Sequence, residues 1–560
     1  MGRVILFSKI LSKILKSKKN NCLLITPPLL EPNTYYLAMP LLVGQLLQSG
    51  YSAKNLDLNI RFFRTVLSVN YIEQTKKKLD LKNILYDQEY VDFLVRNIEK
   101  ALNDYVFGEN GGEEYIKAQE VIESVLKFIS LPYTDFELNK LTGFENSFIG
   151  FDYVYQKIKE ISFDEEKNIF INFFDNIINE IIEQDVSFVG ITIPFPGTII
   201  PAFTLARLLK EKTDVHVALG GNLLKSDQLI DFPEIFDIYC DSVLIGDGEK
   251  SIVELLMSIE NKQNKKSVSG LIYKNRNNQV CYNPSKPITK MNNIANISLE
   301  GINLKEYMTK HPNIYLMASK GCYWGKCSFC GLATKYRQYC TMPPEELVSK
   351  FKEIKQKYQA EGWFLLQDDS IPPGYLSKLA DEIIKQGVEV YYGIFARLEK
   401  SFDRELLEKL YKSGLRTIYW GLESGCQKTL DEMNKGIKID NVYQILKDSY
   451  EVGIDSMAGI IVNFPTETMQ DHLETIEFLK TVKEYVRISP GEFCVMKNTI
   501  VEQHNEEYGV KISALNRDRF DYYPGWEHAI LQKNEQQKKW ENFCKFVKNE
   551  NYSVDENKRL

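Results

Sequence analysis

The sequence predicts two α/β domains: a doubly wound, Rossmann-like domain with an open parallel sheet, and a partial (β/α)6 barrel of the TIM type. Short apolar runs alternate with helical runs in residues 21–65 and again in 185–290, and six such pairs follow within 300–495. A chain of 560 residues is also too long for one ordinary domain. Strands that alternate with helices form parallel sheets, whose ligands bind at the carboxyl ends of the strands.

Residues 1–20 form a basic amphipathic segment, in which apolar positions such as Ile10 and Ile14 recur at helical spacing between lysines. Lysines interrupt the apolar run and no small-residue cleavage site follows, so we do not expect a signal peptide. Two interpretations stay open: a docking helix or solvated tail, which the sequence favours, and peripheral contact with a membrane. No apolar run is long enough for a transmembrane helix.

The net charge is −7, which argues against a sequence-independent nucleic-acid partner because such proteins carry a basic face. Seven of the ten cysteines are scattered singly. This dilution is unlike a disulfide framework, and we expect the reducing cytoplasm as the location.

The first domain is predicted to open with a strand, a helix and a second strand, and then to be interrupted. Residues 66–184 show helical periodicity with almost no strand signal, which predicts a mostly helical insertion. The alternation then returns. The predicted elements of this domain are strands at 22–25, 54–57, 187–193, 215–219 and 242–246, and helices at 37–47 and 198–210 and from residue 247 onward.

Residues 262–300 are polar and turn-rich, which predicts a linker with a hairpin tip at 275–278. The barrel follows, and several of its helices end at glycine, as a left-handed C-cap requires. Residues 496–560 form a polar C-terminal extension with aromatic residues gathered at 520–526. The predicted barrel strands are 314–318, 363–367, 388–395, 417–420, 457–462 and 486–490, and the helices between them are 345–359, 376–385, 403–412, 441–451 and 468–482.

Three cysteines lie on one glycine-punctuated loop directly after the first barrel strand. Cys322, Cys327 and Cys330 have the spacing C-x4-C-x2-C. An iron–sulfur cluster held by three thiolates leaves one iron open to a small molecule. A structural zinc site needs four ligands, and Cys340 would supply the fourth. Both interpretations stay open at this point, and the barrel context favours the cluster.

A three-cysteine loop in this place, with Phe329 just before the last cysteine, resembles the radical S-adenosylmethionine (SAM) superfamily. The resemblance implies a 4Fe–4S cluster whose open iron binds SAM, and reductive cleavage of SAM to a 5′-deoxyadenosyl radical. The family usually has C-x3-C-x2-C. This chain has one more residue in the first gap, Tyr323 to Lys326, and the sequence does not explain it.

The same resemblance implies SAM contacts at the ends of later barrel strands. Glu423 would contact the ribose or the methionyl amine, and Arg397 the methionyl carboxylate. The segment from Gly459 to Pro465, with Ile461, resembles the stretch that lies against adenine. Asp368 and Asp369, which end the second strand, would add polar contacts. The alternative for each of these residues is a strand-end side chain that only satisfies a turn.

Segments of the first domain resemble cobalamin-binding domains fused to radical enzymes, among them Thr26-Pro-Pro28, Leu219-Gly-Gly-Asn222 and Gly246 to Ser251. The motif Asp-x-His-x-x-Gly is missing, so the resemblance offers no histidine as lower cobalt ligand. The alternative is a domain that binds nothing or forms a dimer surface. The resemblance implies cofactor contacts at Thr26, Asp57, Asn59, Thr192, Gly220, Gly221, Gly246, Gly248 and Glu249.

The sequence therefore predicts an enzyme, a cobalamin-dependent radical SAM C-methyltransferase acting on a peptide natural product or a small metabolite. A reductant of the flavodoxin or ferredoxin type would serve it. No residue is assigned a catalytic role. Two alternatives remain: radical rearrangement or oxidation without methyl transfer, and a non-catalytic, zinc-stabilised corrinoid-binding protein. RNA methylthiolation is disfavoured because Cys22, Cys240 and Cys281 are isolated and form no second cluster site.

Overall fold

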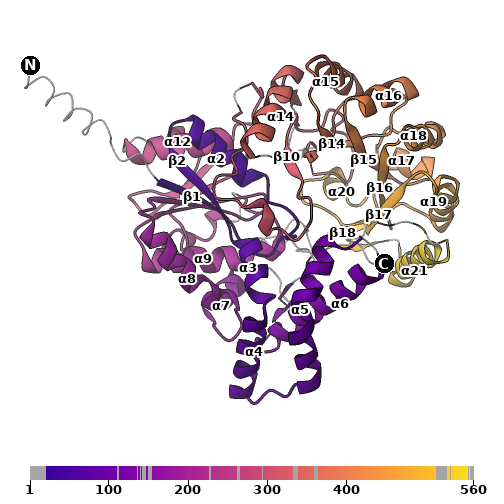
Figure 1. The fold of residues 1–560 in the computed structure, drawn as a ribbon. Helices are drawn as coiled ribbons and strands as arrows, with labels where there is room; N and C mark the ends of the chain where they lie inside the picture. Colours follow the sequence, from indigo (N-terminus) through magenta and orange to yellow (C-terminus); the bar gives the residue numbers. More distant parts are fainter. Residues whose placement is uncertain are drawn as a thin grey trace, which may run out of the picture. The chain divides into compact units, whose positions relative to one another are not determined.

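The computed structural model divides into two compact units (Figure 1). The first unit runs to Lys286 and also takes in Ile294–Lys310, and the second takes in most of the chain from His311 onward. The predicted N-terminal segment 1–20 and most of the aromatic stretch 520–526 lie outside the described residues. The structure describes residues 21–109, 112–134, 136–138, 141, 147–148, 154–225, 229–261, 265–292, 294–331, 339–358, 363–512, 526–529, 531–550, 552 and 554.

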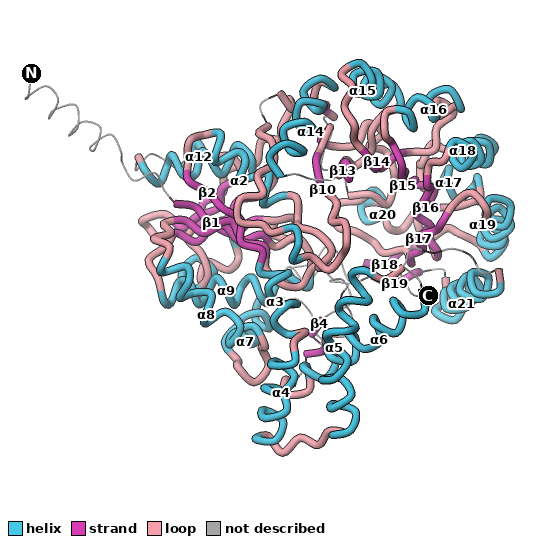
Figure 2. Tube along the Cα trace, viewed as in Figure 1, coloured by secondary structure: helices cyan, strands magenta, loops and turns pink. Residues whose placement is uncertain are grey.

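The first unit contains a seven-stranded sheet in the order β2-β1-β5-β6-β7-β8-β9. Figure 2 shows its neighbouring strands β1 and β2. The first five strands in this order pair in parallel and the last two pairings are antiparallel. The parallel part confirms the predicted doubly wound sheet. The strands are β1 (Asn21–Thr26), β2 (Ser52–Asp57), β5 (Phe188–Thr192), β6 (His216–Gly220), β7 (Ser242–Leu244), β8 (Leu271–Lys274) and β9 (Val280–Tyr282).

Helices cover both faces of this sheet. Helices α2 (Ala38–Gln48) and α12 (Gly248–Glu260) lie on one face, and α3 (Leu58–Val66), α8 (Phe170–Glu183) and α9 (Ile199–Lys212) lie on the other (Figure 1). Strand β1 is consequently apolar and buried along nearly its whole length, as expected for a strand that is covered twice.

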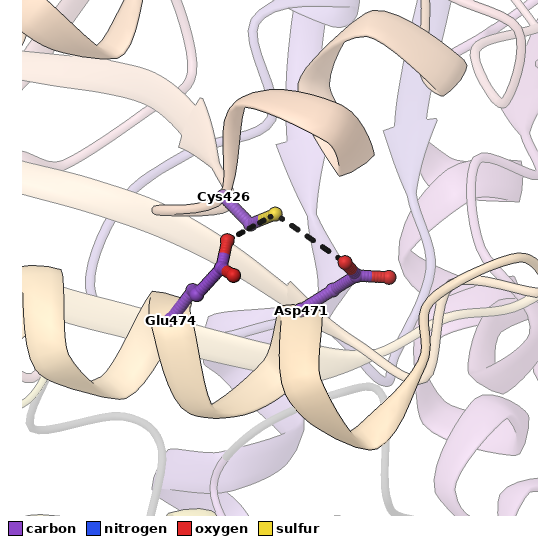
Figure 3. A group of neighbouring side chains, drawn as sticks. All are labelled: Cys426, Asp471 and Glu474. Carbon is purple, nitrogen blue, oxygen red and sulfur yellow. Dashed lines mark hydrogen bonds between the residues drawn. The ribbon is translucent and has the colours of Figure 1, made fainter.

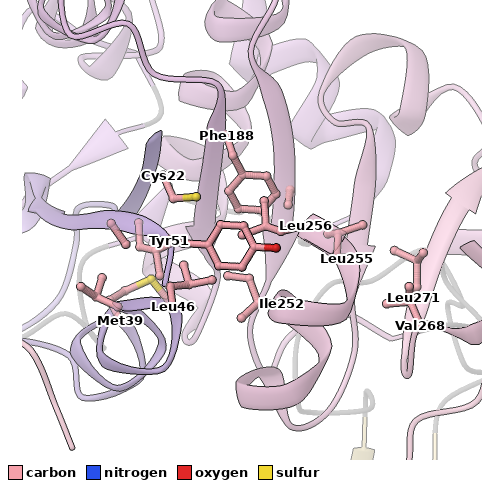
Figure 4. Packing of buried hydrophobic residues seen from close by; sticks show 14 of the residues in the cluster. Cys22, Met39, Leu46, Tyr51, Phe188, Ile252, Leu255, Leu256, Val268 and Leu271 are labelled. Atoms are coloured by element: carbon pink, nitrogen blue, oxygen red, sulfur yellow. The ribbon is translucent and has the colours of Figure 1, made fainter. Parts of the chain in front are cut away.

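The core between the sheet and the α2–α12 face is a cluster of buried side chains (Figure 4). Leu46 of α2 and Leu255 and Leu256 of α12 are fully buried there against Phe188 of β5. Each such aliphatic side chain contributes about 1.5–3 kcal/mol when it leaves water. This packing fixes α2 and α12 on the sheet and sets the positions of the loops that precede them.

The insertion is mostly helical, as predicted, with α4 (Val69–Leu81), α5 (Gln88–Phe107), α6 (Glu113–Ser130) and α7 (Tyr155–Phe163). A short strand pair, β3 (Phe136–Glu137) with β4 (Ser147–Phe148), adds to it. The sequence assigned residues up to 184 to the insertion, but helix α8 packs beside α9 on the sheet. The layered domain therefore resumes one helix earlier than predicted.

The second unit contains a six-stranded sheet in the order β10-β13-β14-β15-β16-β17, with parallel pairing throughout. A helix follows each of the first five strands, which confirms the partial (β/α)6 barrel. The strands are β10 (Ile314–Leu316), β13 (Trp363–Leu366), β14 (Tyr391–Ala396), β15 (Leu415–Glu423), β16 (Asp455–Val462) and β17 (Arg487–Glu492). The helices are α14 (Pro344–Tyr358), α15 (Pro373–Lys385), α16 (Arg404–Lys412), α17 (Gln427–Glu432), α18 (Ile439–Val452) and α19 (Met469–Val482).

The predicted linker is more structured than its polar composition indicates. The predicted hairpin exists, with Asn278 at positive φ in its turn, and its strands β8 and β9 extend the first sheet. Residues 294–310 pack on the first unit, where the Asn55 N–H donates to the Glu300 carbonyl at 2.8 Å. The first unit therefore reaches ten residues beyond the predicted boundary at 300.

The C-terminal extension closes part of the second unit. Helix α20 (Ile500–Gln503), the pair β18 (Val510–Ile512) and β19 (Trp526–His528), and helix α21 (Lys533–Asn549) belong to it. Val501 and Val510 join Phe464 and Phe493 in a buried cluster against which Phe329 of the cysteine loop packs. Among the described helices, none combines the length and the apolar composition needed to cross a membrane.

Candidate active site

The three predicted cluster ligands lie on one loop at the carboxyl end of the first barrel strand. Cys322, Cys327 and Cys330 are all free thiols. The strand pair β11 (Ser319–Lys320) with β12 (Cys340–Thr341) closes the base of the loop. Cys340, the alternative zinc ligand, lies on β12, where its thiol donates to the Ile288 carbonyl at 3.6 Å. The geometry thus gives Cys340 a main-chain partner at the base of the loop.

Asp368 fixes the main chain where it enters the cysteine loop. The carboxylate accepts hydrogen bonds from the Ala318 N–H at 3.0 Å, from the Ser319 N–H and from the Ser319 hydroxyl at 2.5 Å. Burial raises the pKa of Asp368 to about 7, although these donors oppose the shift. Its oxygens are already used by the loop, so the structure gives Asp368 a supporting position. Asp369 is exposed.

The longer first gap of the cysteine motif holds two aromatic side chains that anchor the loop to the barrel. The Tyr323 hydroxyl donates to Glu399 Oε1 at 2.8 Å, and Trp324 Nε1 donates to the Asn434 carbonyl at 2.9 Å. A Cβ at position 436 would lie 2.3 Å from the Trp324 ring, so glycine is required there. The extra residue therefore has a structural explanation that the sequence alone did not give.

A buried network of charged groups lies beside this loop. Arg397, which follows β14, is 3% exposed, stacks over the Trp324 ring at 4.3 Å and donates to the Lys435 carbonyl at 2.6 Å. Lys435 Nζ in turn donates to Glu423 Oε1 at 2.8 Å. The structure thus brings the two predicted residues, Arg397 and Glu423, into one network. It also adds Lys435, which the sequence analysis missed.

The cations of this network act on the thiols of the loop. Burial raises the pKa of Cys327, and the charges of Lys435 and Arg397 oppose that rise. For Lys435, burial lowers the pKa, but the negative charges of Glu423 and Cys327 outweigh burial and raise it. Nearby cations favour the thiolate form that metal binding needs. The network can therefore support an anionic metal centre on this loop.

The backbone makes room for this network at two strand ends. Glu423 ends β15 at an irregularity in strand pairing and has a φ of +70°. A Cβ at Gly421 would lie 2.7 Å from Lys435 Nζ, so a larger residue there would displace the end of this lysine side chain. Gly459 of β16 faces the second carboxylate oxygen of Glu423, at 3.6 Å from its ideal Cβ position.

The turn after β16 also carries a polar atom that its surroundings do not satisfy. Asn463 is 2% exposed and has a φ of +67°. Its Nδ2 donates to Glu492 at 3.0 Å, but within the described residues its buried Oδ1 accepts no hydrogen bond. A buried acceptor without a donor carries a free-energy cost of about 1–3 kcal/mol unless a ligand or water donates to it. The predicted adenine segment from Gly459 through Ile461 to Pro465 contains this residue.

The predicted cobalamin contacts in the first unit lie at the carboxyl ends of its parallel strands. Asp57 ends β2 and accepts from the Asn59 N–H at 2.9 Å, the Ile60 N–H at 3.1 Å and the Tyr307 hydroxyl at 2.6 Å. Burial raises the pKa of Asp57 to about 6. The Asn59 side chain accepts from the Leu30 N–H at 2.7 Å. Asp57 and Asn59 therefore hold their own loops in place.

The other predicted contacts are gathered at the same edge. Thr26, Thr192 and Gly220 are the last residues of β1, β5 and β6. Gly248 and the buried Glu249 open helix α12. Gly221 has a φ of +114°, and a Cβ there would lie 2.5 Å from the backbone of Ile193. A Cβ at Gly246, with a φ of +89°, would lie 2.1 Å from Ser285 Oγ.

A second group of side chains of the kind that can bind metal ions, Cys426, Asp471 and Glu474, lies elsewhere in the barrel unit (Figure 3). The Cys426 thiol donates to Glu474 Oε2 at 3.1 Å and to Asp471 Oδ1 at 3.7 Å, and burial raises its pKa. Asp471 is already paired with Lys428 at 2.7 Å and completes a capping box with Thr468. We assign this group to the attachment of α17 to α19.

Comparisons with known proteins agree with this geometry. Residues 317–479 match the model of the Radical SAM superfamily, and this range contains the cysteine loop, Arg397, Glu423 and Lys435. An uncharacterized methyltransferase of Pyrococcus horikoshii is 22% identical over 404 residues, which are 68% of this chain and 85% of that relative.

Two solved structures share the fold over nearly the whole chain. One is the cobalamin-dependent SAM radical enzyme OxsB with aqua-cobalamin and SAM bound; it has a TM-score of 0.62 and 12% identity, and the match covers 94% of this chain and 66% of that chain. The other is the radical SAM methyltransferase TsrM from Kitasatospora setae with cobalamin and a 4Fe–4S cluster bound; it has a TM-score of 0.57 and 13% identity, and the match covers 93% and 91%.

These findings define the class of protein. Residues 317–479 are a radical SAM domain, and the chain as a whole has the fold of two radical SAM enzymes that were solved with cobalamin bound. A radical SAM domain uses a 4Fe–4S cluster and SAM, so the predicted fold, enzyme class and these two cofactors are confirmed.

Proposed function

We propose that this protein is a cobalamin-dependent radical SAM enzyme that methylates an unactivated carbon of a peptide or small metabolite. The observation that carries the proposal is the cysteine loop beside the Arg397–Lys435–Glu423 network, in a chain that also has a Rossmann-like unit. The printed names of similar proteins support it, since one relative is a methyltransferase and both structures bind cobalamin.

Cys322, Cys327 and Cys330 would hold the cluster through three thiolates. When bound, the cluster, SAM and cobalamin together supply one-electron chemistry and a transferable methyl group. The chain's own part is to stabilise charge and to orient these groups. Burial raises the pKa of Cys327, and the charges of Lys435 and Arg397 oppose this rise, which favours the thiolate needed for metal binding.

The network has hydrogen-bonding capacity left for SAM. Arg397 has five N–H donors, and its contacts with Glu399 and the Lys435 carbonyl leave others available for a carboxylate. Glu423 uses Oε1 for Lys435, and its Oε2 faces Gly459 and can accept from an ammonium or hydroxyl group. Asn463 Oδ1 is a buried acceptor in need of a donor, such as an amino group of adenine.

Cobalamin would bind in the first unit at the edge formed by the ends of β1, β5, β6 and β7. Ligands of open parallel sheets bind at this edge. Gly220 has no atom closer than 3.6 Å to its ideal Cβ position, which leaves the strand end accessible to a large, flat ligand. We further propose that a reductant of the flavodoxin or ferredoxin type supplies the electron.

Anaerobic purification tests the cluster and its chemistry. We expect a brown protein with about four irons per chain that releases 5′-deoxyadenosine from SAM when it is reduced. The Cys327→Ala variant should release none. A colourless protein with one zinc per chain would support the non-catalytic corrinoid-binding alternative and contradict the proposal.

Isotope labelling separates methyl transfer from the other radical outcomes. With hydroxocobalamin and SAM carrying a deuterated methyl group, the modified substrate should gain the labelled methyl group. A product that is rearranged or oxidised without the label would support the alternative without methyl transfer. Binding of hydroxocobalamin, followed by its absorbance, tests the first unit separately.

A further inference from the structure

The first unit contains a cleft whose polar side chains have no assigned purpose. It has a volume of about 640 Å³ and lies where helix α4 of the insertion faces helix α8 of the layered domain. Asn70 and Gln74 line it from α4, and Asn172 and Asn176 line it from α8. The volume is in the range of about 300–1,000 Å³ that is typical of ligand sites.

These four amide groups are available to a ligand. Within the described part of the chain, none of the four side chains has a hydrogen-bond partner. Each pair is spaced i, i+4, so both members lie on one face of their helix. An amide offers both donors and an acceptor, and the two walls therefore present the same mixed hydrogen-bonding pattern.

This pattern fits the backbone of an extended peptide. Residues four apart on a helix are about 6 Å apart along its axis. Alternate residues of an extended strand repeat at about 6.6–6.8 Å, so successive amides on one wall can meet successive outward-facing peptide groups. Each peptide group also carries one donor and one acceptor, which is what an amide side chain complements.

The remaining lining residues argue against an anion and favour a chain with side groups. Arg61 is already paired with Glu180 through two hydrogen bonds of 2.7 and 2.5 Å, so its charge is neutralised. Lys78 also lines the cleft; its Nζ lies 4.1 Å from the centre of the Tyr133 ring, and burial lowers the pKa of Lys78. Phe173 adds a further aromatic surface.

We propose that the α4–α8 cleft binds an extended segment of a peptide, held by Asn70, Gln74, Asn172 and Asn176. The inference deepens the proposed function, on which it rests, because it selects a peptide over a small metabolite as the substrate class. The insertion would then serve to recognise a part of the substrate that is not modified.

A displayed library of random dodecapeptides, selected on the full-length wild-type chain, tests the proposal. We expect enriched sequences whose synthetic peptides bind the wild type. They should bind the Asn172→Ala/Asn176→Ala and Asn70→Ala/Gln74→Ala variants at least about tenfold more weakly. Asn179→Ala is the matched control, because Asn179 is exposed on α8 but does not line the cleft. It should bind as the wild type does.

Failure to enrich any peptide, or equal binding by the wild type and both double variants, would overturn the proposal. Thermal unfolding by circular dichroism checks that the variants fold, which we expect because all four amide residues are exposed. Binding is measured without SAM or cobalamin. Its failure is therefore distinguishable from failure of the proposed function, which is read from SAM cleavage and methyl transfer.

Discussion

Two buried aspartates, one in each unit, occupy equivalent places at the ends of parallel strands. Asp57 is the last residue of β2 and Asp368 follows β13, and burial raises the pKa of both carboxyl groups. Both accept two main-chain N–H groups and one hydroxyl group, from Tyr307 in the first case and Ser319 in the second. From the sequence, both looked like contacts for a cofactor.

The two carboxylates differ in what they hold. Asp57 caps helix α3, so its contacts stabilise the first unit. Asp368 holds Ala318 and Ser319, which lead into the cysteine loop, so its contacts reach the metal ligands. The comparison indicates that a strand-end carboxylate is a ligand candidate when one of its oxygens can still accept a hydrogen bond. Within the described residues, no hydrogen bond to Glu423 Oε2 is present, whereas Oε1 accepts from Lys435. The comparison also predicts that substitution of Asp368 affects the metal site, whereas substitution of Asp57 affects the stability of the first unit.

Asp368→Ala is expected to have the largest effect. It leaves two N–H groups and one hydroxyl group without their acceptor, and each buried, unsatisfied group costs about 1–3 kcal/mol. The cysteine loop should then lose its position. We expect the iron content per chain to fall below half of the wild-type value, and the rate of SAM cleavage to fall at least about a hundredfold. Iron analysis and 5′-deoxyadenosine release measure this. The exposed Asp381→Asn is the control. Full iron content in Asp368→Ala would show that the loop does not depend on this carboxylate.

Lys435→Met sharpens the comparison, because it tests a residue whose charge acts on the Cys327 thiol. Removal of one member of a buried ion pair costs about 3–5 kcal/mol, because the partner charge stays behind. We expect SAM cleavage to fall at least about tenfold. Lys438→Met is the matched control, since the Lys438 side chain is 65% exposed and should tolerate the change. The double variant Lys435→Met/Glu423→Gln should recover stability in urea but not SAM cleavage, whereas a merely structural pair would recover both.

The raised pKa of Asp57 leads us to expect a specific pH dependence of the stability of the first unit. Its pKa is about 6 in the folded state and about 3.9 when unfolded. The unfolded chain therefore loses this proton first, and the group's contribution to stability falls between about pH 4 and pH 6 and levels off above. Over this range the contribution changes by about 3 kcal/mol. In Asp57→Asn, urea unfolding between pH 4 and pH 7 should lack this part of the wild-type dependence. An unchanged profile would contradict a raised pKa at Asp57.

The barrel and the cysteine ligands could be predicted from the sequence because their signals are local. Each strand–helix pair has its own apolar periodicity, and Cys322, Cys327 and Cys330 lie within nine residues of one another. Lys435 has no such local signal. No local pattern marks one lysine as buried, because its partners Glu423 and Arg397 lie 12 and 38 residues away in the chain.

Long-range partners and edge strands could not be predicted in this way. Tyr307 is 250 residues from Asp57, and the sequence gives no reason to pair them. The strands β8 and β9 were assigned to a linker because polar, turn-rich residues surround them, although the strands themselves are short and mostly apolar. Strand β8 is recognised only through its pairing with β7, which lies about thirty residues earlier in the chain. Both misses concern positions whose environment is built by distant parts of the chain.

Tyr307→Phe should have the smallest effect and tests the long-range contact alone. The variant keeps the buried ring and removes one hydrogen bond to Asp57. We expect a loss of about 1–2 kcal/mol in the free energy of unfolding, because hydrogen bonds to charged groups contribute about 1.5–3 kcal/mol and Asp57 keeps its two N–H donors. The hydroxyl group lowers the pKa of Asp57, so its removal should move the Asp57-dependent transition to higher pH. Urea unfolding at several pH values measures both effects, with the exposed Tyr450→Phe as the control. If Tyr307→Phe matches this control, the hydroxyl does not contribute to the stability of the first unit, and the equivalence of the two aspartates fails.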